Sequence, residues 1–480
     1  MASQFAAGYR GVLRELRKSL DPSRKVNPVI KSHYRSVIEG LRSTQNVDGL
    51  ADINHTIIFL KSQREHQRLL DRYSPLFDLT AQERIKATAR RVGLNMPKLH
   101  QAGENEGEPK FSSPDTLPIL QQAAHHLCDL QETVVFPTET VYGLGAVATI
   151  TEASSKIFSA KGRPPDNPLI VHVSSVKMLK SLLPPDYLFS EAYQVLMKHF
   201  WPGALTLLFP RNSDVIPTII TAGQPSVAVR MPSHPVARAL IAVSGMPLAA
   251  PSANTSGKPS PTRAEHVVKD LDGKVPLVID GGSCGVGLES TVVDGLQGDG
   301  NIRILRPGGV TVEQIEAVLK QDFPTGRAPS VLVHKRDYQD EEMESAPTTP
   351  GMKYRHYSPS VPVTLLCTLS KPAPDQASQS IDTFLASISS PSKVGILAAS
   401  DSKIWKKIKD IKGYHWHEFP LGPTSTPSLI AQRLFDGLLT LESENVDLIL
   451  VEEIIEEHEG LAVMNRVRKA AGTTQWVWYE

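Results

Sequence analysis

The chain has 480 residues, of which 40% are hydrophobic and 21% charged, and its formal net charge is zero. This composition excludes a disordered or fibrous chain, and the length predicts about three globular domains. The charge is uneven: residues 1–100 carry 18 Lys and Arg against 9 Asp and Glu, a net of +9, so residues 101–480 sum to −9. A basic N-terminal part joined to an acidic remainder indicates two parts with different partners.

The three cysteines, Cys128, Cys284 and Cys367, are far apart and form no Cys-x-x-Cys pair. This pattern excludes a disulfide scaffold and argues against a structural zinc site, so we expect no protein-bound metal and a reducing compartment. No apolar run approaches the roughly 18 residues of a membrane span, and the first 20 residues lack the apolar core of a signal peptide. We expect a cytoplasmic location and, because those residues are rich in arginine, a mitochondrial one in addition.

Apolar residues recur at helical spacing through residues 1–100, which predicts an all-α bundle. The predicted helices cover residues 3–20, 28–41, about 47–73 and 80–92, and Thr80 and Glu83 have the spacing of a capping box. The bundle has no Gly-rich loop, paired carboxylates or His cluster, which favours a binding module over an enzyme. Residues 101–112 are polar and predict a flexible linker.

The segment from Gly8 to Arg17, the Tyr34-Arg35 pair and the closing VGLNMPKLH resemble the small LYR-like assembly factors of mitochondrial ATP synthase. The resemblance covers about residues 5–100. It implies a helical, chaperone-like module whose partner belongs to ATP synthase assembly.

Short apolar runs alternate with amphipathic segments over residues 113–322, which predicts a mixed α/β domain. The predicted strands are 134–136, 169–173, 205–209, 227–230, 248–250, 277–280 and 290–294. The predicted helices are 114–130, 152–160, 190–199, 235–244, 263–270 and 312–319. In this architecture ligands bind at strand ends.

The stretch from Phe136 to Val173 carries Lys161, Arg163 and Asn167 on a loop too rich in Pro and Gly to be helical. Two cations on such a loop suit a phosphate or carboxylate ligand, and a solvated basic turn is the alternative. Further polar residues mark other strand ends and polar loops: Thr140, His172, Ser226, Arg230, Ser252, Asn254, Ser260, Ser290 and Arg306. Each alone has an ordinary structural explanation, but their convergence in one domain predicts a binding site.

Residues 323–360 predict a linker, but residues 353–357, Lys-Tyr-Arg-His-Tyr, suit a segment that lies across a ligand. Residues 361–480 predict a second α/β unit. Its predicted strands are 363–366, 394–397 and 448–451, and its predicted helices are 381–388, 401–409, 428–439 and 460–472. A G-x-G-x-x-G motif is absent from the unit, so the sequence gives little support for a nucleotide site there.

The motifs PTETVYGLGA, KGRPPDNPLIVH, WPGALT, VAVRMPSHP, AAPSANTSGKPSPT, DGG, ESTVVD and LRPG occur in this order. Residues 113–480 therefore resemble the long form of the YrdC/YciO-type threonylcarbamoyl-AMP synthase family. The resemblance implies a YrdC-like catalytic domain with a twisted mixed sheet at 113–322, a linker at 323–360 that folds over the active site, and a Rossmann-like domain at 361–480.

The resemblance also implies a nucleotidyltransferase that joins L-threonine, bicarbonate and ATP into threonylcarbamoyl-AMP and pyrophosphate, with Mg²⁺ arriving on ATP. The product would pass to a threonylcarbamoyl transferase complex that modifies position 37 of tRNA. Lys161, Arg163, Ser252 and Asn254 would be catalytic. ATP would be bound by Lys161, Arg163, Asn167, Ser226, Ser252, Asn254, Ser260, Arg306 and Tyr354, and threonine by Thr140, His172, Arg230, Ala250 (through its backbone) and Ser290.

Three alternatives stay open at this point. The α/β part could be a double-stranded RNA-binding module, although its acidic balance weakens an RNA contact. The chain could act chiefly as an assembly factor with an inert α/β passenger. The N-terminal part and the remainder could also be separate proteins joined at residues 101–112.

Overall fold

The computed structural model describes residues 116–479, apart from gaps at 325, 335, 339–355, 373–375, 389–391, 409–410 and 412, together with a few residues between 12 and 62. The chain divides into two compact units, Met1–Gly107 and Glu108–Glu480. In the first unit the few described residues, such as 12–14, are helical. The predicted helical bundle otherwise lies outside the described residues, as do the linker at 101–112 and Tyr354.

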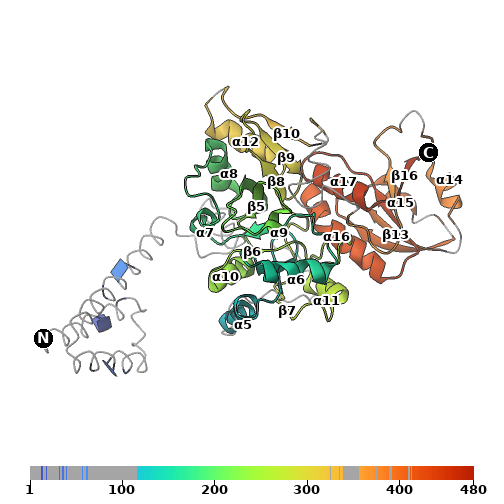
Figure 1. The fold of residues 1–480 in the computed structure, drawn as a ribbon. Coiled ribbons are helices and arrows are strands. Elements are labelled where there is room, and N and C mark those ends of the chain that lie inside the picture. Colours follow the sequence, from blue (N-terminus) through green and yellow to red (C-terminus); the bar gives the residue numbers. More distant parts are fainter. Residues whose placement is uncertain are drawn as a thin grey trace. The chain divides into compact units, whose positions relative to one another are not determined.

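A mixed ten-stranded sheet forms the first layer of the second unit (Figure 1). From one edge to the other its strands are β10 (Val331–Val333), β9 (Ile302–Arg306), β8 (Thr291–Asp294), β4 (Leu205–Pro210), β5 (Ser226–Arg230), β3 (Ile170–His172), β6 (Leu248–Ala249), β2 (Gly143–Val147), β1 (Val134–Phe136) and β7 (Leu277–Val278). Most of these strands are buried on both faces, which explains their continuous apolar runs.

Helices pack against this sheet around one large apolar core (Figure 1). They are α5 (Thr116–Cys128), α6 (Thr151–Lys161), α7 (Val176–Lys180), α8 (Glu191–Phe200), α9 (Thr218–Thr221), α10 (Pro235–Ser244), α11 (Ala264–Leu271) and α12 (Val312–Asp322). Two pairs, α5 with α10 and α8 with α12, lie side by side. Capping hydrogen bonds define where some of these helices begin. The Ser190 hydroxyl accepts a hydrogen bond from the Tyr193 amide at the start of α8, and Thr311 and Gln314 form a capping box at the start of α12.

Strand register brings distant residues to one place. In the parallel pair β3–β5, His172 lies opposite Arg230, and in the antiparallel pair β4–β5, Thr206 lies opposite Arg230. Strand β8 pairs in parallel with the other side of β4, with Thr291 opposite Leu205. The ends of β3, β5, β4 and β8 therefore meet where the predicted site residues His172, Arg230 and Ser290 lie.

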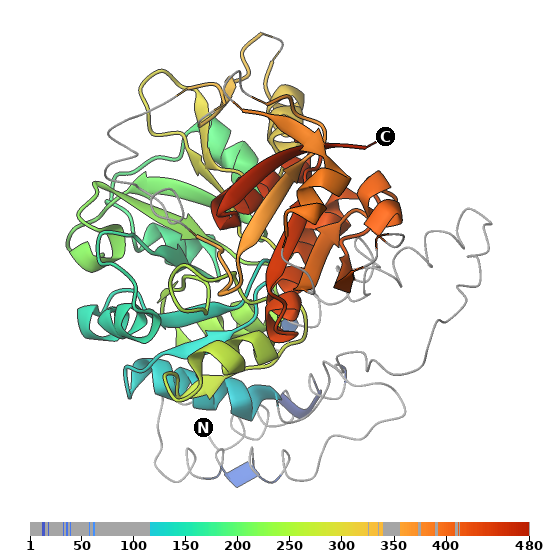
Figure 2. The same cartoon turned by 90° about the vertical axis from the view of Figure 1, so that its right-hand side faces the viewer.

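A second sheet, of six parallel strands, occupies the C-terminal part (Figure 2). Its order is β12 (Ser378–Ser380), β16 (Thr473–Trp478), β11 (Val363–Cys367), β15 (Leu448–Glu452), β13 (Ser392–Ala398) and β14 (Tyr414–Pro420), and its helices are α14 (Ile381–Ala386), α15 (Lys403–Lys407), α16 (Pro427–Ser443) and α17 (Glu459–Ala470). Helices α16 and α17 lie between the two sheets in Figure 1. Polar contacts from α16, such as Arg263 to Asp436 at 2.6 Å and Gln432 to the Cys284 carbonyl, join the two parts.

The sequence pattern did not predict several strands. The strand β2 has the sequence GLGAV, which is poor in β-branched residues. Tertiary packing explains it, since a Cβ on Gly145 would lie 2.5 Å from the Phe136 ring. The strand β16 follows a helix that was predicted to run to residue 472 but ends at Ala470. None of the described helices has the length and apolar character needed to cross a bilayer.

Candidate active site

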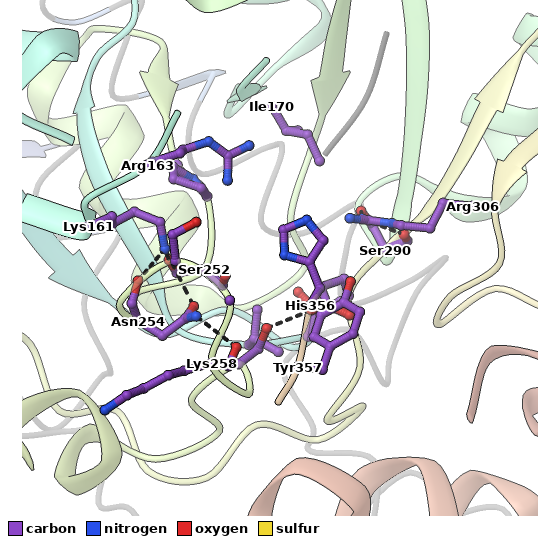
Figure 3. A pocket seen from close by; sticks show the side chains of 18 of the residues that line it. Lys161, Arg163, Ile170, Ser252, Asn254, Lys258, Ser290, Arg306, His356 and Tyr357 are labelled. Carbon is purple, nitrogen blue, oxygen red and sulfur yellow. Dashed lines mark hydrogen bonds between the residues drawn. The ribbon is translucent and has the colours of Figure 1, made fainter. Parts of the chain in front are cut away.

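One cavity in the second unit collects most of the predicted site residues (Figure 3). Its lining includes five cations and one carboxylate: Lys161, Arg163, Arg230, Lys258, Arg306 and Glu289. With five cations against one carboxylate, these six side chains carry a formal net charge of +4. Such a concentration of positive charge in a concave site attracts anions.

Lys161 is the last residue of α6 and is 1% exposed. Gly162 follows with a φ of 59°, a left-handed conformation that glycine adopts without strain, and turns the chain into the loop. The Lys161 ammonium donates to the carbonyl oxygens of Ser252 and Asn254, both at 2.5 Å. Burial, and then the nearby Arg163, hold the pKa of Lys161 well below its ordinary value. A phosphate beside this ammonium would reverse that effect.

Arg163 shapes the loop on which it lies. Its Nε donates to the Asn167 carbonyl at 3.2 Å and its Nη2 to the Pro168 carbonyl at 2.8 Å. Burial lowers the pKa of Arg163 to about 10, so it stays charged at neutral pH. Asn167 is buried, its side-chain amide has no hydrogen-bond partner, and it is not among the residues that line the cavity. The backbone carbonyls thus hold the guanidinium in one orientation.

Arg230 is fixed by three partners at the end of β5. Its guanidinium donates to Glu139 at 2.6 Å, to the Thr140 hydroxyl at 2.8 Å and to the Gly203 carbonyl at 3.1 Å. Burial alone would raise the pKa of Glu139, but the Arg230 charge together with hydrogen bonds from Arg230 and from backbone amides outweighs it, so the net shift is downward. Glu139 also accepts from the backbone amide of Ser233 at 3.0 Å. The pair is therefore ionised, and it orients Arg230 before any ligand arrives.

His172 lies beside Arg230 on β3 and is 3% exposed. Burial, and then the Arg230 charge, lower the pKa of His172 to about 3. The imidazole is therefore neutral at physiological pH, and its Nδ1 lies 3.2 Å from the Ile170 carbonyl. Because it lines the cavity, His172 offers a ligand hydrogen bonding rather than charge.

Ser290 and Arg306 form the opposite wall of the cavity (Figure 3). Arg306 Nη2 donates to the Ser290 carbonyl at 2.8 Å, and the Ser290 hydroxyl lies 2.7 Å from that of Thr206. Arg306 is buried, and burial lowers its pKa, while Tyr357 and Glu289 oppose the shift. On this wall, the buried guanidinium of Arg306 is thus fixed by its hydrogen bond to Ser290.

The segment 356–360 begins at the cavity, which its first two residues, His356 and Tyr357, line. Figure 3 shows the His356 ring between Lys161 and Arg163 on one side and Ser290 and Arg306 on the other. Tyr357 has a φ of 64° and packs on Phe435 with ring centroids 5.2 Å apart. The space that remains is about 70 Å³, well below the roughly 300 Å³ of small ligand sites. In the described conformation little space therefore remains among these side chains.

A buried ion pair joins the cavity to the C-terminal part. Glu289 accepts from the Ser260 hydroxyl at 2.6 Å and from Nε of Arg466, on α17, at 3.1 Å. Arg466 is fully buried, also donates to the Pro307 carbonyl, and lies 5.7 Å from the Tyr357 ring centroid. Burial alone would raise the pKa of Glu289, but Arg466 and Arg306 lower it overall. A residue of the second sheet's domain thus touches three segments around the cavity.

The cavity brings together most, but not all, of the residues that the sequence analysis selected. Ser226 lies at the end of β5 opposite Arg230, and neither Ser226 nor Asn167 lines the cavity. Tyr354 lies outside the described residues. The residues that do line it are Thr140, Lys161, Arg163, His172, Arg230, Ala250, Ser252, Asn254, Ser260, Ser290 and Arg306.

Glu139, Glu289 and Arg466 are not among the site residues predicted from the sequence. Glu139 and Glu289 belong to the motifs PTETVYGLGA and ESTVVD, and a charged residue next to a buried strand could have signalled them. Arg466 lies within the helix predicted at 460–472, and no local pattern connects it to Glu289. Among the described residues, no group of three or more His, Cys, Asp or Glu is arranged to hold a metal ion.

We expect acid to loosen the segment 356–360. Burial, and then the charges of Arg163 and Lys469, lower the pKa of His356 to about 4, from an ordinary 6.5. The docked segment therefore favours neutral His356, and its docking is weakened as pH falls below 6.5, by about 2 kcal/mol at pH 5. Hydrogen exchange of this segment should be faster at pH 5 than at pH 7.5 after correction for the intrinsic rate. The His356→Gln variant should lack this difference, and equal protection of the native segment at both pH values would contradict the expectation.

Three family profiles match the chain. Residues 128–308 match the Sua5, YciO and YrdC family described as "Telomere recombination", and residues 310–472 match the "Threonylcarbamoyl-AMP synthase, C-terminal domain". A threonylcarbamoyl-AMP synthase of Schizosaccharomyces pombe is 43% identical over 380 residues, covering 74% of this chain and 89% of the relative. The chain belongs to the threonylcarbamoyl-AMP synthase family. Residues 6–95 match the family described as "Complex1_LYR-like", so both predicted resemblances are confirmed.

Two further relatives support the assignment to this family. The threonylcarbamoyl-AMP synthase of Bacillus subtilis is 42% identical, covering 74% of this chain and 93% of its own length. The crystal structure of Pyrococcus abyssi Sua5 complexed with L-threonine matches with a TM-score of 0.60 and 39% identity, covering 75% of this chain and 96% of that chain. The predicted multidomain architecture is confirmed at this level: a mixed sheet in the family's catalytic part and a parallel sheet in its C-terminal part.

Proposed function

We propose that the chain is an L-threonylcarbamoyladenylate synthase, a nucleotidyltransferase that condenses L-threonine, bicarbonate and ATP. The threonine amine and bicarbonate form a carbamate with loss of water, and a carbamate oxygen attacks the α-phosphate of ATP. The bond to pyrophosphate then breaks, giving threonylcarbamoyl-AMP. The observation that carries the proposal is the cationic cavity, in a chain that is 43% identical to a threonylcarbamoyl-AMP synthase.

The nucleotide side of the proposed site comprises Lys161, Arg163, Ser252, Asn254, Ser260 and Arg306, all of which line the cavity. Charge accumulates on the α-phosphate and the leaving pyrophosphate, and preorganised cations stabilise such charge without reorganising during the reaction. The carbonyls that hold Lys161 and Arg163 in place support this role. Asn167, Ser226 and Tyr354 remain part of the proposed ATP set.

The threonine side comprises Thr140, His172, Arg230, Ser290 and the backbone of Ala250. Arg230 would bind the α-carboxylate, and its fixed orientation removes part of the entropic cost of binding. His172 is neutral and would form a hydrogen bond with the substrate. A bound L-threonine in the Pyrococcus abyssi relative supports this half of the proposal.

Mg²⁺ would enter as part of the ATP substrate. Glu289 is the one carboxylate that lines the described cavity, and Arg466 and Ser260 already engage it. This donor set does not suit a protein-held Mg²⁺, which prefers several oxygen ligands. The protein residues would therefore contact phosphate, and the phosphates would hold the metal.

Exchange of labelled pyrophosphate into ATP tests the proposed reaction. The full chain should catalyse exchange only when L-threonine and bicarbonate are both present, because the carbamate is the nucleophile. Omission of either substrate should remove the exchange. Exchange that does not require threonine, or no exchange together with retained binding of double-stranded RNA, would contradict the enzyme assignment.

Replacing Arg230 by alanine should weaken threonine binding by about 2–4 kcal/mol, the range expected for loss of a charge-assisted contact. This corresponds to a roughly 30- to 900-fold higher KM for threonine, with a smaller change in kcat. Arg238→Ala, at an exposed position on the adjacent α10, is the matched control and should leave this KM unchanged. A threonine KM within threefold of the native value in Arg230→Ala would remove Arg230 from the site.

The match of residues 6–95 to LYR-like proteins supports a second role for the N-terminal part, as a helical module that binds an ATP synthase assembly partner in mitochondria. The product of the catalytic part would then serve a tRNA-modifying complex in the same compartment or in the cytoplasm. Immunoblotting of fractionated cells tests this. A single band near 52.5 kDa in the mitochondrial fraction is expected, and two shorter polypeptides would contradict it.

A further inference from the structure

A second cavity lies in the C-terminal part, at the carboxyl ends of the parallel strands. Its volume is about 560 Å³, within the roughly 300–1,000 Å³ of small-molecule sites. The carboxyl ends of β11, β13, β14 and β15, with the loops that follow them, line it through Thr368, Ala399, Ser425 and Glu452. It has no lining residue in common with the cationic cavity, so the proposed reaction does not account for it.

The topology of the second sheet favours a ligand here. Strands β15 and β13 are neighbours, with Leu397 opposite Val451. After β13 the chain continues to β14, on one side, whereas after β15 it continues to β16, on the other side. The connections therefore diverge between these two strands and open a crevice at their carboxyl ends. Open α/β sheets bind ligands at such a switch point.

Glu452, the last residue of β15, is 6% exposed and lines this cavity. Its Oε1 accepts from the Tyr479 hydroxyl at 3.4 Å, and Ser402 and the Ala399 backbone also interact with the carboxyl, but its buried Oε2 has no hydrogen-bond partner within 3.5 Å. The adjacent Glu453 differs, since its Oε2 accepts from three successive backbone amides, residues 368–370. Burial raises the pKa of Glu452 to about 7. An acceptor left unpaired inside a cavity is costly, and a ligand that donates to it relieves this cost.

The other lining residues indicate the charge and polarity of the ligand that supplies this donor. The carboxylates are Glu452, Glu453 and Glu457, against Lys403 and His458. Lys403 lies over the Tyr479 ring at 5.9 Å, and the His458 imidazole lies 3.8 Å from Glu313. The three carboxylates therefore outnumber the one lysine, which is itself engaged by the Tyr479 ring. The remaining wall is mainly apolar and includes Pro427, Ile430, Ile454 and Ile455.

We propose that this cavity is a binding site for a small amphipathic amine. The ligand's ammonium group donates to Oε2 of Glu452, and its hydrocarbon part packs against Ile430 and Ile454. An ammonium group donates a hydrogen bond to the unpaired oxygen and is attracted by the acidic lining. An anion would instead be repelled by the three carboxylates.

Calorimetric titration of the full chain with three probes of one shape tests the proposal. The probes are 2-phenylethylammonium, 2-phenylethanol and 3-phenylpropionate, with saturating L-threonine present so that the substrate amine site is filled. We expect saturable one-to-one binding of the ammonium, binding of the alcohol at least tenfold weaker, and no binding of the carboxylate. Absence of saturable ammonium binding, or tighter binding of the carboxylate, would overturn the proposal.

The Glu452→Gln variant assigns the site. It keeps the side-chain shape and removes the charge, so ammonium affinity should fall at least tenfold while the melting temperature of the free protein is not lowered. Glu457→Gln, at an exposed position on the rim, is the matched control and should change the affinity less than threefold. Equal affinity in native protein and Glu452→Gln would refute the role of Glu452.

A pH titration of the native protein gives a test that does not depend on a variant. The ammonium requires ionised Glu452, so protonation of a carboxyl with a pKa of about 7 competes with binding. The affinity should fall about tenfold from pH 8 to pH 6. A constant affinity over this interval would contradict binding at Glu452.

Discussion

Replacing Lys161 by alanine is expected to lower kcat for threonylcarbamoyl-AMP formation at least 100-fold. The Lys161 ammonium is 1% exposed and lies in a cavity whose single lining carboxylate is engaged by Arg466. Removing one preorganised donor to developing charge in a site that excludes water costs about 3–4 kcal/mol, a factor of 10²–10³. Steady-state kinetics with threonine and bicarbonate saturating would measure the loss.

Lys156→Ala provides the matched control for this prediction. Lys156 is exposed on the same helix, α6. Its replacement also removes one lysine side chain, but from a position outside the cavity. The variant should retain at least half of the native kcat. Lys161→Ala also leaves the carbonyls of Ser252 and Asn254 without their donor, so its melting temperature should be recorded. Comparable kcat in both variants would exclude Lys161 from the chemistry.

Replacing Arg466 by alanine is expected to destabilise the protein by about 3–5 kcal/mol, the cost of breaking one side of a buried ion pair. The variant leaves Glu289 buried beside Ser260 with its main counter-charge gone. The Glu289 charge, already part of the cavity lining, would then be balanced by Arg306 alone, which weakens the positive field at the nucleotide. We therefore expect a KM for ATP at least tenfold higher as well. Chemical denaturation and steady-state kinetics measure the two effects separately.

Arg468→Ala tests whether these effects belong to the buried pair. Arg468 lies on the same helix and pairs with Glu456, but both side chains are partly exposed, so its loss should cost no more than about 1 kcal/mol. The double variant Arg466→Met, Glu289→Gln removes both charges and should be more stable than Arg466→Ala alone. If Arg466→Ala kept native stability and native KM for ATP, the pair would have no role in the site.

The sequence predicted the elements whose signal is local. Val134–Phe136 is a short apolar run before a proline, and it forms β1. Strand β2 was not predicted because its glycines are explained only by the Phe136 ring packed against them. Strand β16 was not predicted because its residues become a strand through pairing with β11 and β12, which precede it by about 100 residues.

The same distinction holds for the site. Lys161, Arg163, Ser252 and Asn254 were selected as cations and polar groups on Pro- and Gly-rich loops, and the fold brings them to one cavity. Glu139 pairs with Arg230 over 91 positions, and Glu289 pairs with Arg466 over 177 positions. No spacing rule links such residues, so only the folded chain reveals how they pair.

Incorporation of labelled bicarbonate tests the central claim most directly. The full chain, incubated with labelled bicarbonate, L-threonine and MgATP, should form a labelled product that co-migrates with threonylcarbamoyl-AMP, with one pyrophosphate released per product. The Lys161→Ala, Arg163→Ala double variant should form none within the assay time, while Lys156→Ala should match the native protein. No labelled product from the native chain, or equal product from the double variant, would contradict the proposed activity or its assignment to this cavity.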